Sequence, residues 1–219
     1  MFSEKITKEE IKCFIGLMIY SGYAPVPLMH LYWDFKQDLH NDLVSNAMRR
    51  NRMYTIKNYI HFADIGELEP HDKIWKLRPL MDKMKERCIA NFVATTELLN
   101  YDDSMVNFFG RRNIKQFIPG KPIRFGYKMC CLNSSEGYLL NFNLYQGVDP
   151  RIPDQFNQLF GKCAAPLVVM QNEFPHSIQT LPFDFFFDNQ FIGTNLFTYL
   201  KFRGYSATGT FRENRLPKT

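Results

Sequence analysis

Phe183-Asp184-Phe185-Phe186-Phe187-Asp188 is the most apolar run in the chain, and its composition predicts a buried strand. A second β-like segment, Glu97–Val106, contains the stretch Leu98-Leu99-Asn100-Tyr101-Asp102-Asp103. An acidic residue beside a buried strand is unfavourable unless it is solvated, paired or bound to a cation. We therefore single out Asp102 and Asp188 as candidate functional residues.

Further β-like segments surround these two and are separated by Gly, Pro and Ser turn signals. They comprise Gly126–Leu132, Tyr138–Tyr145 and Tyr205–Phe211, with a helical stretch over Phe191–Arg203. Three strands in meander order, a crossover, a fourth strand, a helix and a fifth strand predict a mixed sheet with helices on its faces. The stretch Val148–Pro182 is compatible with short helices or with a buried strand.

The first hundred residues have helical periodicity. Thr7 and Glu10 have the spacing of a capping box and begin a helix that continues to Gly22. A second helix is expected over Ser45–Phe62, with Met48, Ile56, Tyr59 and Ile60 on its buried side. A third helix is expected from about Lys73 to Ile89, with an apolar stripe formed by Ile74, Leu77, Leu80, Met81, Met84 and Cys88. The fold class is therefore α/β (α+β), with a helical region before the sheet.

Composition narrows the functional classes. The net charge of +5 fits nucleic-acid binding but is also found in many ordinary basic proteins. The five cysteines have no regular spacing, and no apolar run approaches the ~18 residues of a membrane span, so we expect an intracellular protein that does not bind membranes. The histidines are scattered and nucleotide-binding glycine motifs are absent from the sequence, so neither zinc nor a small-molecule cofactor is expected.

Asp102 and Asp188 permit two interpretations. Carboxylates on adjacent strands can meet over one spot and hold Mg²⁺, and two such ions would support phosphodiester chemistry. Alternatively, Asp102 is a turn residue, and Asp188 together with Asn189 caps the following helix.

A basic stretch follows the first of these aspartates. Between residues 111 and 128 there are six basic residues and no acidic ones, with two phenylalanines interleaved. Cations that bind phosphates beside carboxylates that bind metal are what a nuclease-like site requires. A solvated basic loop is the alternative. The candidate DNA-binding residues are Arg111, Arg112, Lys115, Lys121, Arg124 and Lys128.

The sequence also resembles the piggyBac transposase family, and the similar motifs occur in order along almost the whole chain. They are Leu31-Tyr32-Trp33, His61-Phe62-Ala63-Asp64, Lys76-Leu77-Arg78-Pro79-Leu80, Tyr101-Asp102-Asp103-Ser104-Met105, the block from Lys115 to Lys128, Phe187-Asp188-Asn189-Gln190-Phe191 and the block from Ala207 to Arg215. The resemblance implies a helical dimerisation and DNA-binding region at residues 1–96. It further implies the first part of an RNase H-like catalytic domain at residues 97–219, with Asp102 and Asp188 as the first two members of a metal-binding aspartate triad.

The resemblance also implies a nuclear protein that binds DNA, with a possible homodimer. The third family aspartate lies downstream of the block that ends at Arg215, so we expect this chain to lack a complete Mg²⁺ site and to be catalytically inactive. Two alternatives stay open. The chain is an active Mg²⁺-dependent transposase if the gene model is incomplete, or it is a protein-interaction module or truncated isoform.

Overall fold

The computed structural model describes residues 5–36, 38–64, 66, 69–94 and 97–211. The chain forms two compact units, Met1–His61 and Phe62–Thr219. The boundary expected at residue 96 follows secondary-structure character, whereas the compact units separate after residue 61. The helix before the first strand therefore belongs to the unit that contains the sheet.

The first unit is helical. Its elements are α1 (Lys8–Tyr23), the 3₁₀ turn η1 (Met29–Trp33), α2 (Asp42–Ala47) and α3 (Arg50–Tyr59). The expected capping box is confirmed, because the Glu10 N–H donates to the Thr7 hydroxyl and the Thr7 N–H donates to the Glu10 carboxylate. The core of this unit is formed by Phe14, Leu17, Tyr32, Val44, Met48, Met53 and Ile56.

The single helix expected over Ser45–Phe62 is wrong, since α2 ends at Ala47 and α3 begins at Arg50. Met48 between them has an extended backbone, with φ −154° and ψ 140°. Its side chain is buried and its carbonyl accepts the indole N–H of Trp33 at 2.8 Å. A tertiary hydrogen bond thus satisfies the carbonyl outside a helix. Tyr59, expected on the buried side, is 56% exposed.

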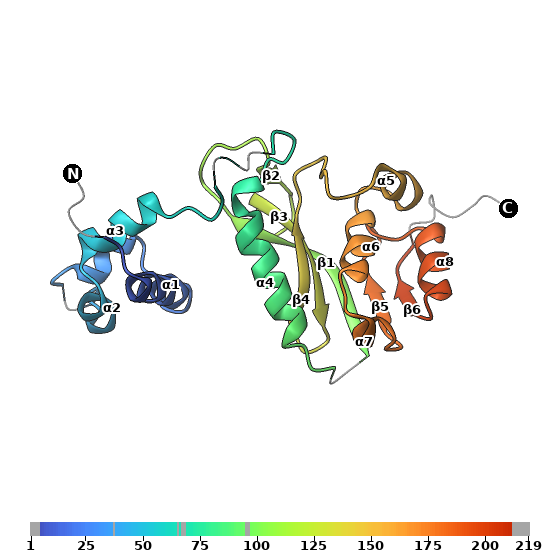
Figure 1. Ribbon diagram of the computed structural model, residues 1–219, viewed down its shortest axis with the longest axis horizontal. Coiled ribbons are helices and arrows are strands. Elements are labelled where there is room, and N and C mark those ends of the chain that lie inside the picture. The colour runs from blue at the N-terminus through green and yellow to red at the C-terminus, as the bar shows by residue number, and fades with distance from the viewer. Residues whose placement is uncertain (1–4, 37, 65, 67–68, 95–96, 212–219) are drawn as a thin grey trace. The chain divides into compact units, whose positions relative to one another are not determined.

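The second unit contains the predicted mixed sheet (Figure 1). Its strands are β1 (Leu98–Asn107), β2 (Gln116–Phe117), β3 (Phe125–Ser134), β4 (Leu139–Leu144), β5 (Asp184–Phe187) and β6 (Ser206–Gly209). The strand order is β2-β3-β1-β5-β6, with β4 also paired to β3. Strands β1, β3 and β4 pair antiparallel, whereas β5 is parallel to both β1 and β6.

Helices pack on both faces of this sheet. Figure 1 shows α4 (Arg78–Ala90), which follows the 3₁₀ turn η3 (Trp75–Leu77), running alongside β4. The stretch Val148–Pro182 forms three helices, α5 (Asp154–Phe160), α6 (Ala165–Asn172) and α7 (His176–Gln179), and α8 (Thr194–Phe202) connects β5 to β6.

Two apolar cores result from the alternation of side chains along the strands. The larger core packs α6 and α8 against a face that includes Leu99, Tyr101 and Phe185. The smaller core packs Met81 of α4 against Cys131 and neighbouring apolar residues of β4.

The buried face of α4 differs from the expected apolar stripe. Leu77, Leu80 and Met84 are 37–47% exposed, whereas the buried residues are Arg78, Met81, Lys85 and Ile89. Arg78 and Lys85 can be buried because carboxylates of other segments pair with them. Of the expected stripe, Ile74 and Met81 are buried as predicted. A hydropathy pattern assigns the two cations to solvent and therefore misses them on the buried face.

Candidate functional site

Asp102 and Asp188 lie on neighbouring strands. The parallel β1–β5 register pairs Leu98 with Asp184 and continues to Tyr101 with Phe187, so one further step aligns Asp102 with Asp188. Adjacent strands lie about 4.8 Å apart, and residues in register point to the same face. The two carboxylates therefore leave the same face of the sheet, opposite to the side chain of Tyr101.

The hydrogen bonds of these carboxylates are local. Asp102 Oδ1 accepts the N–H of Asp103 at 2.7 Å, and Asp188 Oδ1 accepts the N–H of Asn189 at 2.6 Å. The Oδ2 atom of each accepts no hydrogen bond within the described part of the chain. One oxygen of each aspartate is thus available to a cation.

The interpretation of Asp102 as a turn residue and of Asp188 as a helix cap does not fit the structure. Asp102 lies inside β1, which continues to Asn107, and is therefore not a turn residue. The N-cap of α8 is Gly193, so Asp188 does not cap this helix. Asp188 is exposed, and Asp102 is partly buried.

The Asp102–Asp188 pair supplies only some of the ligands that a divalent cation requires. Mg²⁺ is commonly held by one or two carboxylates together with waters and substrate phosphates. Among the residues that the structure describes, no group of three or more His, Cys, Asp or Glu side chains is placed to hold a metal ion. Cys131, which pairs with Asp102 across β1 and β3, is an unsuitable ligand because burial raises the pKa of its thiol to about 12.

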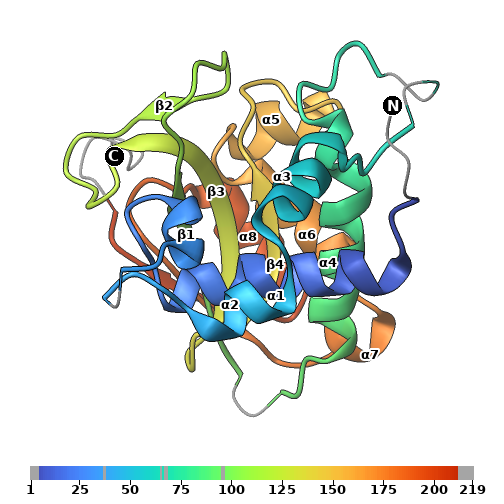
Figure 2. The same ribbon diagram turned by 90° about the vertical axis from the view of Figure 1, so that its left-hand side faces the viewer.

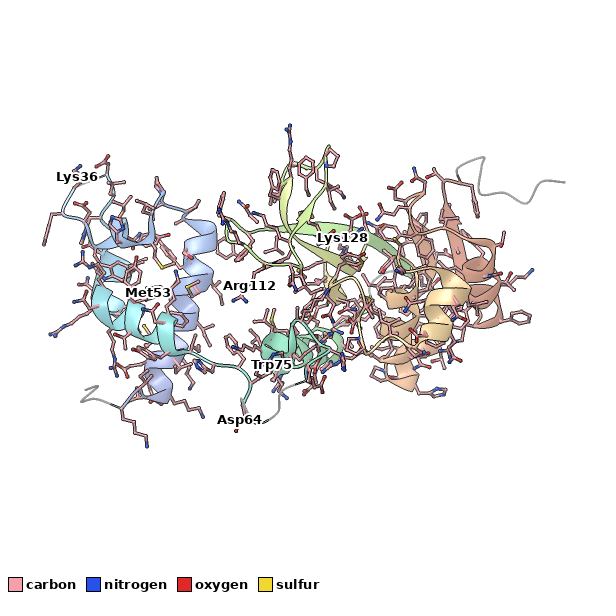
Figure 3. The ribbon with its side chains drawn as sticks, turned by 90° about the horizontal axis from the view of Figure 1, so that it is seen from above. Lys36, Met53, Asp64, Trp75, Arg112 and Lys128 are labelled. Atoms are coloured by element: carbon pink, nitrogen blue, oxygen red, sulfur yellow. The ribbon has the colours of Figure 1, made fainter. Side chains whose placement is uncertain are left out.

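The basic residues lie in and around the β2–β3 hairpin at one edge of the sheet. Figures 1 and 2 show β2 and the start of β3 at the margin of the sheet, where Gln116 pairs with Gly126. Arg111, Arg112 and Arg124 are exposed, and their side chains form no hydrogen bond or ion pair with other described residues. Figure 3 shows Arg112 out on the loop before β2 and Lys128 over the sheet.

The hairpin also carries exposed aromatic rings. Phe117 and Phe125 stack with their centroids 4.6 Å apart and remain 56% and 53% exposed. Lys115 Nζ lies 5.4 Å from the centre of the Phe125 ring. These residues and the two arginines of the preceding loop line a groove of about 640 Å³. Cations and aromatic faces that share one groove can bind phosphates and bases together.

Lys121 and Lys128 differ from the three arginines because each lies near the buried carboxylate of Asp103. The Nζ atoms are 3.7 Å and 3.9 Å from Asp103 Oδ2. Part of their charge is therefore already balanced within the protein. All six predicted basic residues thus lie in the hairpin region. Asp103 partly neutralises Lys121 and Lys128, whereas the three arginine side chains have no carboxylate partner among the described residues.

The sequence did not reveal the buried ionic network at the start of α4. Arg78 donates to Asp72 at 2.6 Å and to Asp149 at 2.8 Å, and Asn143 donates to the other oxygen of Asp149 at 3.0 Å. The Arg78-Pro79 dipeptide was visible in the sequence, but the helix was expected to begin near Lys73, whereas α4 begins at Arg78. The acidic partners of Arg78, 6 and 71 residues away, were not identifiable.

In the described part of the chain, no helix is long and apolar enough to cross a membrane.

Comparisons with known proteins place these features in context. The family model described as Transposase IS4 matches residues 2–219. The chain is 41% identical over 213 residues to human PiggyBac transposable element-derived protein 3 and 38% identical to human PiggyBac transposable element-derived protein 2. These alignments cover 97% and 96% of the chain, which spans only 35% of each relative's length.

The fold is also similar to a solved structure, a piggyBac transposase synaptic complex with hairpin DNA. The TM-score is 0.73 at 21% sequence identity, and the match covers 98% of this chain and 44% of the other. This similarity shows the expected RNase H-like fold.

Proposed function

This chain belongs to the piggyBac-type Transposase IS4 family, and on that premise we propose that it is a DNA-binding domain derived from a transposase. The observation that carries the proposal is the β2–β3 hairpin, whose three exposed arginine side chains form no ion pair with other described residues, in the same sheet as two carboxylates in register. DNA binding and catalytic state remain proposals for this chain, which spans about a third of the length of its curated relatives.

DNA binding is proposed to use all six basic residues of the hairpin region. The three exposed arginines can pair with phosphates at little desolvation cost. Lys115 borders the same groove, and its neighbour Phe125 offers a face on which a base can stack. Lys121 and Lys128 are expected to contribute less to phosphate binding because Asp103 balances part of their charge.

A salt titration on duplex DNA tests this proposal. Each neutralised phosphate contributes roughly 0.9 to the slope of log affinity against log salt, so three arginine contacts contribute about 2.7. The variant with Arg111→Gln, Arg112→Gln and Arg124→Gln should therefore lose about that much slope. The wild type should lose roughly 40-fold more affinity than the variant between 50 and 200 mM salt.

A second triple variant provides a matched control. Arg87, Lys162 and Lys201 are exposed cations outside the hairpin, and their replacement by Gln removes the same total charge. Equal slopes for the two triple variants would show that overall charge, and not the hairpin, determines binding. Binding that does not respond to salt would instead favour the protein-interaction alternative.

Asp102 and Asp188 are the proposed metal ligands. A Mg²⁺ ion held there would lower the pKa of bound water and stabilise a leaving oxygen in phosphodiester chemistry. The two aspartates, whose side chains leave the same face of the sheet, would hold this ion with one oxygen each. Two carboxylates supply fewer protein ligands than a two-ion site uses, so we propose that the 219-residue chain alone does not cut DNA.

Plasmid nicking with Mg²⁺ or Mn²⁺ tests the catalytic state. The expected result is no nicking above that of the Asp102→Ala variant. Metal-dependent nicking that disappears in Asp102→Ala would support the alternative of an active transposase. Isothermal titration with Mg²⁺ separately tests the site, because both Asp102→Asn and Asp188→Asn should weaken binding.

Nuclear localisation and a homodimer are further proposals that rest on family membership. Microscopy of a fluorescent fusion tests the first, and sedimentation equilibrium tests the second.

A further inference from the structure

Asp102 and Asp103 are neighbours in β1, but their side chains leave opposite faces of the sheet. Asp102 shares the open face with Asp188, whereas the side chain of Asp103 is only 5% exposed and lies on the face of Tyr101. The Asp103 carboxylate accepts no hydrogen bond from the described residues, and two ammonium groups lie within 4 Å of it. A carboxylate this buried depends on those cations.

The first cation, Lys121, lies in the turn between β2 and β3. This turn contains Gly120 with φ +93°, and Lys121 Nζ donates a 3.0 Å hydrogen bond to the Asp103 carbonyl. Strand β2 is only two residues long, so few backbone hydrogen bonds hold the turn. One of them joins the Ile118 N–H to the Arg124 carbonyl at 2.9 Å. Lys121 therefore adds a contact to the central strand that the short ladder cannot provide.

The second cation, Lys128, connects β3 to the loop that carries Asp188. Lys128 Nζ lies 5.8 Å from the centre of the Phe191 ring and 5.9 Å from that of Tyr145. The Phe191 N–H donates to the Asp188 carbonyl at 3.1 Å. The position of Lys128 is therefore linked through Phe191 to the backbone of Asp188.

We propose that Asp103 is a positioning residue, whose carboxylate holds Lys121 and Lys128 and thereby fixes the basic hairpin against β1, the strand that also carries Asp102. This inference rests on the proposed function, since the hairpin is the proposed DNA-binding element. Asp103 serves in this way and not as a further metal ligand, because its side chain points away from the face of Asp102. In this proposal Asp102 binds metal on one face of β1, and Asp103 positions the hairpin from the other face.

Hydrogen exchange of the free protein tests the positioning role without DNA. Asp103→Asn should raise amide exchange several-fold in residues 116–125, while exchange in β5 and α6 stays unchanged. Asp102→Asn makes the same substitution one residue earlier, on the opposite face, and should leave the hairpin unchanged. Equal exchange in the two variants would overturn the inference.

Lys121→Met keeps the inference testable if Asp103→Asn does not fold. The Lys121 side chain is 35% exposed, so its loss is better tolerated than that of a buried carboxylate. Lys121→Met should reproduce the faster hairpin exchange, and adding Asp103→Asn should increase it little further. Faster exchange that adds fully in the double variant would contradict a shared contact.

Two binding measurements separate this inference from the proposed function. Asp103→Asn should weaken duplex DNA binding several-fold and leave Mg²⁺ affinity unchanged, whereas Asp102→Asn should weaken Mg²⁺ binding. Loss of Mg²⁺ affinity in Asp103→Asn would identify it as a ligand and overturn the positioning role. If the wild-type chain does not bind DNA, the proposed function fails, while the exchange result still decides whether Asp103 holds the hairpin.

Discussion

Replacing Arg78 with methionine should strongly destabilise the unit that contains the sheet. Arg78 Nε lies 2.6 Å from Asp72 Oδ2, and Nη2 lies 2.8 Å from Asp149 Oδ1. The side chains of all three residues are at most 6% exposed. Methionine retains much of the apolar stem of arginine but leaves two buried carboxylates without the cation that hydrogen-bonds to both of them.

The expected magnitude follows from this burial. Removing one partner of a buried ion pair costs about 3–5 kcal/mol, because the remaining charge is desolvated and uncompensated. For a domain of 150–250 residues, each kcal/mol shifts Tm by roughly 2–4 °C. The Arg78→Met variant should therefore melt roughly 10 °C below the wild type.

The loss of stability caused by Arg78→Met should depend on pH in a defined direction. Burial opposes the charged form of Asp72, but hydrogen bonds from Arg78 and from the Ile74 N–H hold its pKa below the usual value. This stabilisation is fully present above the unfolded pKa of about 3.9 and is lost as pH falls through the folded pKa. In Arg78→Met the buried carboxylate of Asp72 has lost its Arg78 partner, so burial should raise its pKa. Protonation then removes the unfavourable buried charge. The stability difference should thus be largest near neutral pH and should narrow as pH falls towards about 4.

Thermal and urea unfolding followed by circular dichroism measure this difference. Arg151→Met is the matched control, because Arg151 pairs with Asp82 at 2.7 Å but both side chains are more than 40% exposed. Its loss should not exceed about 1 kcal/mol. Equal losses for the two variants, or a gap that widens on acidification, would refute the assignment of Arg78 as a buried ionic anchor.

Three further substitutions and one chemical modification have defined outcomes. Gly126→Ala places a Cβ 2.0 Å from the Val106 carbonyl oxygen. The overpacking should lower the free energy of unfolding by about 1–3 kcal/mol or more, and Tm with it. Gly16→Ala has nothing within 4 Å of the new Cβ and should raise the free energy of unfolding by roughly 0.5–1 kcal/mol. Thr7→Ala removes the capping box of α1 and should cost about 1 kcal/mol in urea unfolding of the helical unit. Burial raises the pKa of the Cys131 thiol to about 12, so alkylation at pH 8 followed by mass spectrometry should label Cys131 only after unfolding.

Local sequence patterns determined much of the fold. The succession along the chain of all strands except β2, and the mixed sheet, followed from segments whose period and turn signals are local, and the capping box followed from two residues three positions apart. Local patterns failed where a distant partner changes the environment of a residue. The indole of Trp33 satisfies the carbonyl of Met48 and accompanies the break between α2 and α3, and Asp149 enables Arg78 to be buried.

The candidate site shows the same division. The sequence by itself singled out Asp102, Asp188 and the basic stretch as candidate functional residues, because residue type and position after apolar runs are visible without a structure. It could not assign different tasks to Asp102 and Asp103. That distinction depends on the register between β1 and β5, which joins segments more than 80 residues apart, and a shift of one residue would exchange the two faces. The tertiary structure alone decided which aspartate lies beside Asp188 and which holds the lysines.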